Sequence, residues 1–162
     1  MTVQATTSAL APAAVATRVI ALVIDAIVIG LCSFVLGVVV SDGSIVGGVT
    51  RAVIFAVVGF LYFGYTWTTW RASPGQRILG LMTVDATSGA ALTWNQATMR
   101  WVFLFAPSIL SSLFQFSGLS AIVSLIVTCY WIYLLYTTAT DARKQGFHDK
   151  QANTLVITKP AA

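Results

Sequence analysis

Three long apolar stretches, separated by polar segments, dominate the hydrophobic pattern of this chain. The first, from Arg18 to Val40, is apolar for about 22 residues, which is enough to cross a bilayer as a helix. The second covers residues 52–70 and ends in an aromatic-rich segment typical of headgroup depth. Residues 101–138 contain no charged side chain, and this stretch is too long for one span but long enough for two. The pattern predicts four transmembrane helices, at about 18–40, 52–70, 95–116 and 119–138.

The polar segment after the second apolar stretch predicts a small β element. Residues 81–85 and 90–93 carry β-type side chains on both sides of an Asp/Ser/Gly turn, which predicts a hairpin over 81–93. Residues 154–158 predict a C-terminal strand, and we expect it to join the hairpin because a single hairpin is marginally stable. Two capping-box patterns predict helix starts in the same segment, Ser73-x-x-Gln76 and Thr93-x-x-Gln96.

Composition favours an integral membrane protein of the all-α class with a small β element. Of the 162 residues, 57% are apolar and 9% are charged, whereas a soluble domain carries roughly 25% charged residues. We expect residues 1–17 to be disordered and not a secretory signal, followed by a single membrane domain over 18–158 and a tail over 159–162. The net charge of +4 does not form a basic face interleaved with aromatic residues, so we expect no nucleic-acid partner.

The distribution of positive charge predicts the topology. Four spans place both termini and the 71–100 loop on one side, which then holds eight of the nine Lys and Arg residues, while the other side holds only Arg51. Such an excess is typical of the cytoplasmic side, and three spans would remove it. We therefore predict a multi-pass protein of the cytoplasmic membrane with both termini cytoplasmic. Because the third helix has a short apolar part and contains Pro107, a tilted or re-entrant path is an alternative.

Asp25 is the strongest candidate for a functional residue in this sequence. It follows Arg18 by seven residues, so both lie on one helix face with the carboxylate about 10 Å deeper. A carboxylate in hydrocarbon costs at least about 2.5 kcal/mol. In one interpretation Asp25 binds a monovalent cation or a proton, with Arg18 as its counter-charge. In the other, Asp25 bonds Arg18, a Ser/Thr hydroxyl or Arg100 and fixes helix packing.

A second aspartate and several arginines complete the candidate polar network. We expect Asp149 to reach Arg71, Arg77 or Arg100 and to tie the tail to the loop, although Arg77 and Arg100 also suit contacts with lipid headgroups. The sequence contains no HExxH, GxSxG or Walker motif. We therefore expect neither enzymatic activity nor a metal or cofactor site.

These motifs, in this order, resemble the RDD family of bacterial membrane proteins, which is named for one arginine and two aspartates. The matching residues are Arg18, Asp25 and, as the second aspartate, Asp149, in a resemblance that covers about residues 15–158. It implies a bacterial inner-membrane location and a role in transport, since some members resemble sodium–proton antiporters. A further pattern of the family matches Gly75, Gly80, Val84, Asp85 and Gly89.

Two functional hypotheses follow. In the first, the protein is a cation/proton exchanger that uses Asp25 and acts as a homo-oligomer, because four short helices make a thin bundle. In the second, it is a non-transporting accessory or assembly subunit that docks a larger membrane complex. Binding of lipid headgroups by the basic cytoplasmic face is a third, weaker alternative. The expected partners are the lipid bilayer, a monovalent cation, and further copies or a larger complex.

Overall fold

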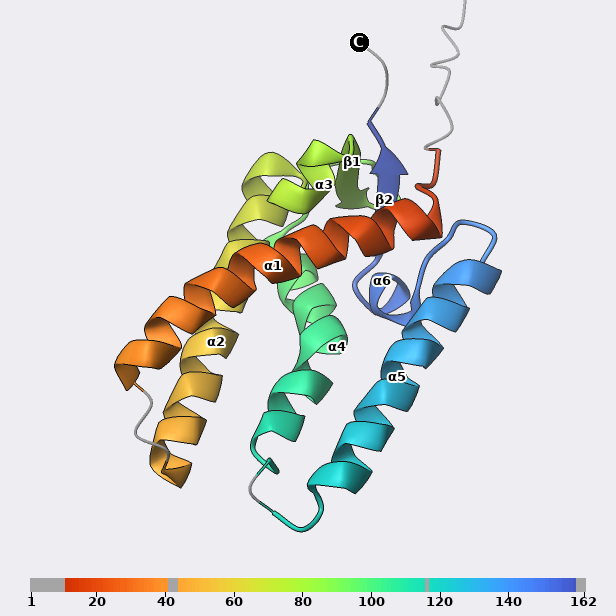
Figure 1. Ribbon diagram of the computed structural model, residues 1–162. Helices are drawn as coiled ribbons and strands as arrows, with labels where there is room; N and C mark the ends of the chain where they lie inside the picture. Colours follow the sequence, from red (N-terminus) through yellow and green to blue (C-terminus); the bar gives the residue numbers. More distant parts are fainter. Residues whose placement is uncertain (1–10, 41–43, 116, 160–162) are drawn as a thin grey trace, which may run out of the picture.

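The protein is a bundle of long helices with a small sheet at one end (Figure 1). A computed structural model describes residues 11–40, 44–115 and 117–159. The end that carries the sheet is called the sheet end here, and the opposite end, where α1 meets α2 and α4 meets α5, is the loop end. The bundle helices are α1 (Val15–Val40), α2 (Ile45–Tyr65), its π-helical continuation η1 (Thr66–Trp70), α4 (Trp94–Ser112) and α5 (Ser120–Thr140). The sheet end holds α3 (Pro74–Ile78), β1 (Leu81–Asp85), α6 (Phe147–Gln151) and β2 (Thr154–Thr158).

Three helices of the described chain are long and apolar enough to cross a membrane. They cover Val15–Val35, Val46–Trp70 and Ser120–Thr140. Their outward faces are apolar and uncovered, as with Phe34 of α1 and Leu125 of α5, and lipid is the solvent that suits such faces. The remaining bundle helix, α4, is less apolar than these three helices and is not among the possible spans. A fourth span therefore stays a prediction. It ends at Ser112, before the expected residue 116, which lies outside the described residues.

Defined structure is present inside the segment that the sequence predicted to be disordered. Residues 1–10 of the segment predicted to be disordered lie outside the described residues, but residues 11–17 have a defined structure. Pro12 forms an isolated bridge with Ile157, and the amide of buried Ala13 donates to the carbonyl of Val156 at 3.0 Å. This pairing fixes the chain before the first span, so α1 begins at Val15 instead of the predicted residue 18.

The predicted hairpin over 81–93 is wrong, while the predicted C-terminal strand is confirmed. Strand β1 pairs antiparallel with β2, in a register that runs from Leu81 opposite Thr158 to Asp85 opposite Thr154. Residues 90–93 form no strand and lead into α4, whose N-cap is Thr93. Burial explains the choice of partner, because the first four residues of β2 are all buried. Pairing with β2 therefore shields more apolar surface than pairing with residues 90–93 would.

Both predicted capping boxes are confirmed, and they set the directions in which α3 and α4 leave the sheet end. Ser73 accepts a hydrogen bond from the amide of Gln76, whose side chain in turn accepts from the amide of Ser73. Thr93 and Gln96 make the same reciprocal pair at the start of α4. These local bonds satisfy the first free amides of each helix.

The turn after β1 gives a pH-dependent prediction for Asp85. The amide of Ser88 donates to its carboxylate, and this bond, with further donors from Ser88, Gln96 and Thr87, lowers the pKa of Asp85 to about 2. A carboxyl whose pKa is depressed on folding stabilises the protein above its unfolded pKa, and that contribution disappears as the pH falls toward the folded value. We expect Asp85→Asn to lower the melting temperature at about pH 6, and the deficit to shrink steadily as the pH falls from about 4 through the folded pKa of about 2. Thermal unfolding of both proteins in detergent measures this, and a deficit of constant size across the range would contradict it.

Candidate functional site

Asp25 lies where α1, α2 and the start of α3 meet. Its side chain is 1% exposed. The carboxylate accepts hydrogen bonds from the hydroxyl of Tyr62 and the amide of Gly75, both at 2.8 Å, and from the hydroxyl of Ser73. Two of the three donors come from the first residues of α3 and its N-cap, where free amides favour a negative group. Asp25 therefore holds α3 against α1.

Arg18 is not the partner of Asp25, although both lie on the expected face of α1. The Arg18 guanidinium forms an ion pair with Asp149 at 2.5 Å and donates to the carbonyl of Lys144. Among the described residues, no basic side chain forms an ion pair with Asp25. The expected Arg18–Asp25 pair is thus replaced by two separate sites, because α6 brings a second carboxylate to Arg18 while α3 supplies neutral donors to Asp25.

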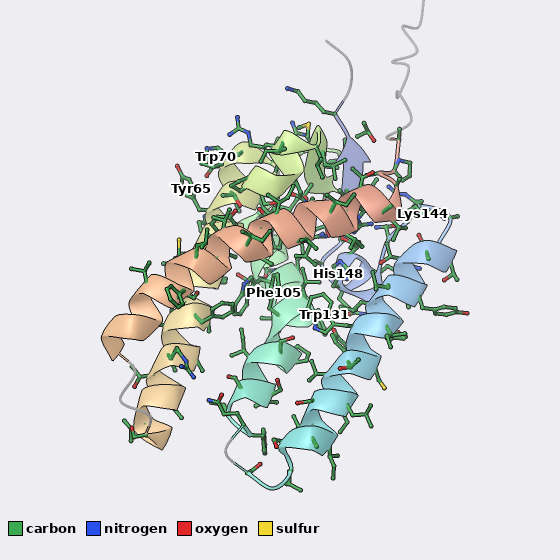
Figure 2. The ribbon with its side chains drawn as sticks, in the orientation of Figure 1. Tyr65, Trp70, Phe105, Trp131, Lys144 and His148 are labelled. Atoms are coloured by element: carbon green, nitrogen blue, oxygen red, sulfur yellow. The ribbon has the colours of Figure 1, made fainter. Side chains whose placement is uncertain are left out.

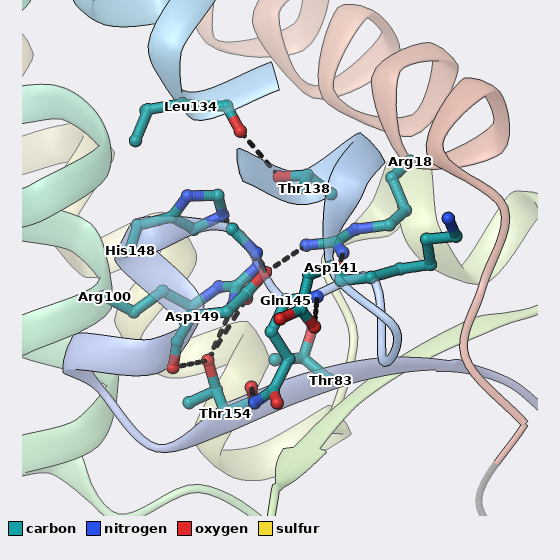
Figure 3. Close-up of polar contacts among 12 residues, drawn as sticks. Arg18, Thr83, Arg100, Leu134, Thr138, Asp141, Gln145, His148, Asp149 and Thr154 are labelled. Carbon is teal, nitrogen blue, oxygen red and sulfur yellow. Dashed lines mark hydrogen bonds and ion pairs between the residues drawn. The ribbon is translucent and has the colours of Figure 1, made fainter. Parts of the chain in front are cut away.

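Asp149 is the centre of the second site (Figure 3). It is fully buried and pairs with Arg100 as well as Arg18. Arg100, which is 3% exposed, also donates to the hydroxyl of Thr154 at 2.7 Å. The amide of Gly146 donates to Asp149 at 3.0 Å. Of the three arginines expected to meet Asp149, only Arg100 does so, and the contacts join α1, α4, α6 and β2.

The charge of this second site depends on His148, which packs beside Asp149. Its Nε2 lies 3.5 Å from an Asp149 oxygen. Burial lowers the pKa of His148 well below its ordinary value, and the charges of Arg100 and Arg18 lower it further. The imidazole is therefore neutral at neutral pH. Two arginines and one aspartate then leave one net positive charge at this second site.

Arg77 does not belong to either site. Its side chain is exposed, and its guanidinium lies over the ring of Trp70 at 5.1 Å. Arg71, the other arginine of this loop, donates to the carbonyl of Gly89 and so closes the loop after β1. Both positions suit the polar boundary of a membrane, as expected for arginines beside an aromatic belt.

A cavity of about 80 Å³ lies between the two sites, bounded by α1, α4 and α5. Arg18, Asp25, Arg100 and His148 contribute to its wall. A second cavity of about 90 Å³ shares Leu22 and Phe63 with the first. A third, of about 240 Å³, shares three residues with the second, namely Phe55, Phe105 and Ile109.

We call these the sheet-end, middle and loop-end cavities, and they follow one another along the bundle. The stacked rings of Phe63 and Phe105, whose centroids are 4.9 Å apart, stand beside the middle cavity. Figure 2 shows Phe105 of α4 with Trp131 of α5 beside it, and their ring centroids are 6.3 Å apart. The sheet-end and loop-end cavities, each with a mainly apolar wall that includes a few polar side chains, are thus separated by the apolar middle cavity.

An apolar helical bundle with three span-length helices defines a multi-pass membrane protein. The chain belongs to the RDD family, whose model matches residues 12–153. Comparisons with curated proteins and with solved structures give no match. Of the three residues assigned to the family name, Arg18 and Asp149 form an ion pair, and Asp25 lines the same cavity as Arg18.

Several contributors to the two sites escaped sequence reasoning. Tyr62 belongs to an aromatic-rich segment in which nothing distinguishes it from its neighbours. Ser73 was identified only as an N-cap, although the same capping pattern implies free amides and therefore a place for a carboxylate. Gly146 and Thr154 carry no recognisable signal, because their role depends on where α6 and β2 pack.

Proposed function

We propose that this protein exchanges a monovalent cation for protons across the bacterial cytoplasmic membrane, with Asp25 as the group that binds each in turn. The observation that carries the proposal is the buried state of Asp25 without an ion pair among the described residues. An intramembrane carboxylate of this kind favours a functional role. Because its protein partners are neutral, a bound proton or monovalent cation can balance its charge.

The donors around Asp25 suit this alternation. The hydroxyls of Tyr62 and Ser73 donate to the carboxylate when no ion is bound, and each hydroxyl oxygen also has lone pairs that can accept. If these hydroxyls rotate, their oxygens and the carboxylate can face a cation together. Sodium sites of transporters likewise use oxygen atoms, there the carbonyls of unwound helix backbone.

The row of cavities supports a route through the bundle. In our proposal all four bundle helices span the membrane, with both termini and the sheet end on the cytoplasmic side. The sheet-end cavity then faces the cytoplasm, and the apolar middle cavity, which Phe63 and Phe105 line, separates it from the loop-end cavity. Transport would require a continuous path through the middle cavity to open while the sheet-end cavity closes. The uncovered face of α5 offers a surface for further copies of the chain.

Sodium–proton exchange in everted vesicles tests the proposal. We expect wild-type vesicles to dissipate a proton gradient on addition of sodium, and Asp25→Asn vesicles to fall to the background of vesicles without the protein. Asp85→Asn is the matched control, since Asp85 lies in the turn after β1 and lines none of the three cavities.

Equal exchange by wild type and Asp25→Asn would refute the role of Asp25. Background activity in every sample, with membrane insertion of each protein verified, would refute cation exchange itself. Exchange by wild type and Asp85→Asn, but not by Asp25→Asn, is the result that we expect.

A second candidate function, an accessory subunit, is favoured by the face of α5. Four of its apolar side chains, Ile122, Leu125, Ile126 and Ile132, are more than half exposed. A transmembrane helix of a larger complex could cover this face, and a second copy of the chain could cover it equally well. Purification in mild detergent distinguishes the two, because foreign subunits in fixed proportion favour an accessory role and a homo-oligomer favours transport.

A further inference from the structure

The loop-end cavity has the features of a binding site that the proposed exchange does not use. It is the largest of the three cavities, about 240 Å³, and lies between α1, α2 and α4. Its wall mixes apolar side chains such as Phe55 and Phe105 with polar ones. The polar members are Ser33, Arg51, Ser108, Ser112 and Gln115.

Arg51 differs from the other arginines of the described chain. Arg18 and Arg100 pair with Asp149, whereas Arg71 and Arg143 donate to backbone carbonyls and Arg77 lies over Trp70. Within residues 11–40, 44–115 and 117–159, Arg51 alone among the arginines makes no hydrogen bond, ion pair or ring contact.

Other polar groups at this cavity are also without partners in the described structure. The hydroxyl oxygen of Ser33 is buried and has no hydrogen-bond partner. The side chain of Gln115 makes no hydrogen bond to any described residue, and its amide can donate two. The wall therefore offers a guanidinium, an amide and a hydroxyl, while the described residues that line it include no carboxylate.

We propose that the loop-end cavity binds an oxyanion, either a phosphate or a carboxylate group, with Arg51 as the counter-charge and Gln115 and Ser33 as hydrogen-bond donors. A guanidinium presents a planar fork of N–H donors that matches two oxygens of such a group. This binding is independent of cation exchange at Asp25. The oxyanion can belong to a phospholipid headgroup of the adjacent leaflet or to a soluble anion that enters from the aqueous side.

Two measurements on the full chain in neutral detergent distinguish these sources. Thermal unfolding is followed while sodium phosphate replaces sodium chloride at constant ionic strength. Native mass spectrometry counts the phosphatidylglycerol molecules that each chain retains. The variants are Arg51→Gln, Arg51→Lys and the matched control Arg77→Gln, which removes an exposed arginine from the sheet end.

We expect wild type and Arg77→Gln to bind, and Arg51→Gln to bind about tenfold more weakly, as for loss of a charge-assisted hydrogen bond. Arg51→Lys should fall between them, because lysine keeps the charge but not the fork. An Arg51-dependent response to free phosphate identifies a soluble anion, and Arg51-dependent retention of phosphatidylglycerol alone identifies a headgroup. Wild-type protein that shows neither response, or responses that Arg51→Gln leaves unchanged, would overturn the proposal.

Discussion

Replacement of Asp149 by asparagine is expected to lower the free energy of unfolding by about 3–5 kcal/mol, the cost of removing one partner from a buried ion pair. Asp149 is fully buried and is the acidic partner of both Arg18 and Arg100. The amide of asparagine has about the same size but cannot balance two guanidinium groups. Arg100 would remain buried with an uncompensated charge, since it is 3% exposed. Unfolding in detergent, followed by circular dichroism against temperature and against SDS, measures the loss.

Asp141→Asn is the matched control for this prediction. Asp141 also pairs with a basic side chain, Lys150, but the two side chains are 16% and 54% exposed. Pairs of this kind contribute less than about 1 kcal/mol. A similar loss in the two variants would mean that the contacts of Asp149 with its arginines do not stabilise the sheet end, and the account of this site would fail.

The long helices could be predicted from sequence because their signals are local. Apolar length identifies α1, α2 and α5, and the capping boxes of α3 and α4 join residues only three positions apart. The hairpin failed for the opposite reason. Strand β1 could pair with residues 90–93, which are close in sequence, or with β2, which lies some seventy positions away. The observed pairing with β2 depends on tertiary burial, which cannot be read from the sequence.

For the candidate site too, the features set by local spacing could be predicted and those set by distant residues could not. Spacing placed Arg18 and Asp25 on one face of α1, and both do line one cavity. The spacing could not predict that Arg18 and Asp25 would bind different partners. The partner of Arg18 is Asp149 of α6, which lies 131 positions further along the chain. Two opposite charges about two helical turns apart therefore predict that both side chains line one environment more safely than they predict an ion pair.

Gly75→Ala is expected to separate α3 from α1 and to destabilise the protein by about 3 kcal/mol, the upper part of the usual cost of overpacking. A Cβ at this position would collide with the backbone carbonyl oxygen of Ala21 and would lie 3.0 Å from the carboxyl carbon of Asp25. A backbone oxygen cannot rotate away as a side chain can, so one helix must move. The movement would stretch the hydrogen bond from the Gly75 amide to Asp25, which is 2.8 Å long.

Gly30→Ala separates this steric effect from the general effect of replacing glycine in a helix. A Cβ at Gly30, on the exposed face of α1, meets nothing within 4 Å. Alanine there should leave stability unchanged or raise it by up to about 1 kcal/mol through its better helix propensity. Because alanine brings the same propensity to α3, a loss confined to Gly75→Ala measures the close approach of α3 to α1 alone. Equal melting temperatures for the two variants would mean that α3 does not rest on the backbone of α1, and Asp25 would then lose two of its three donors.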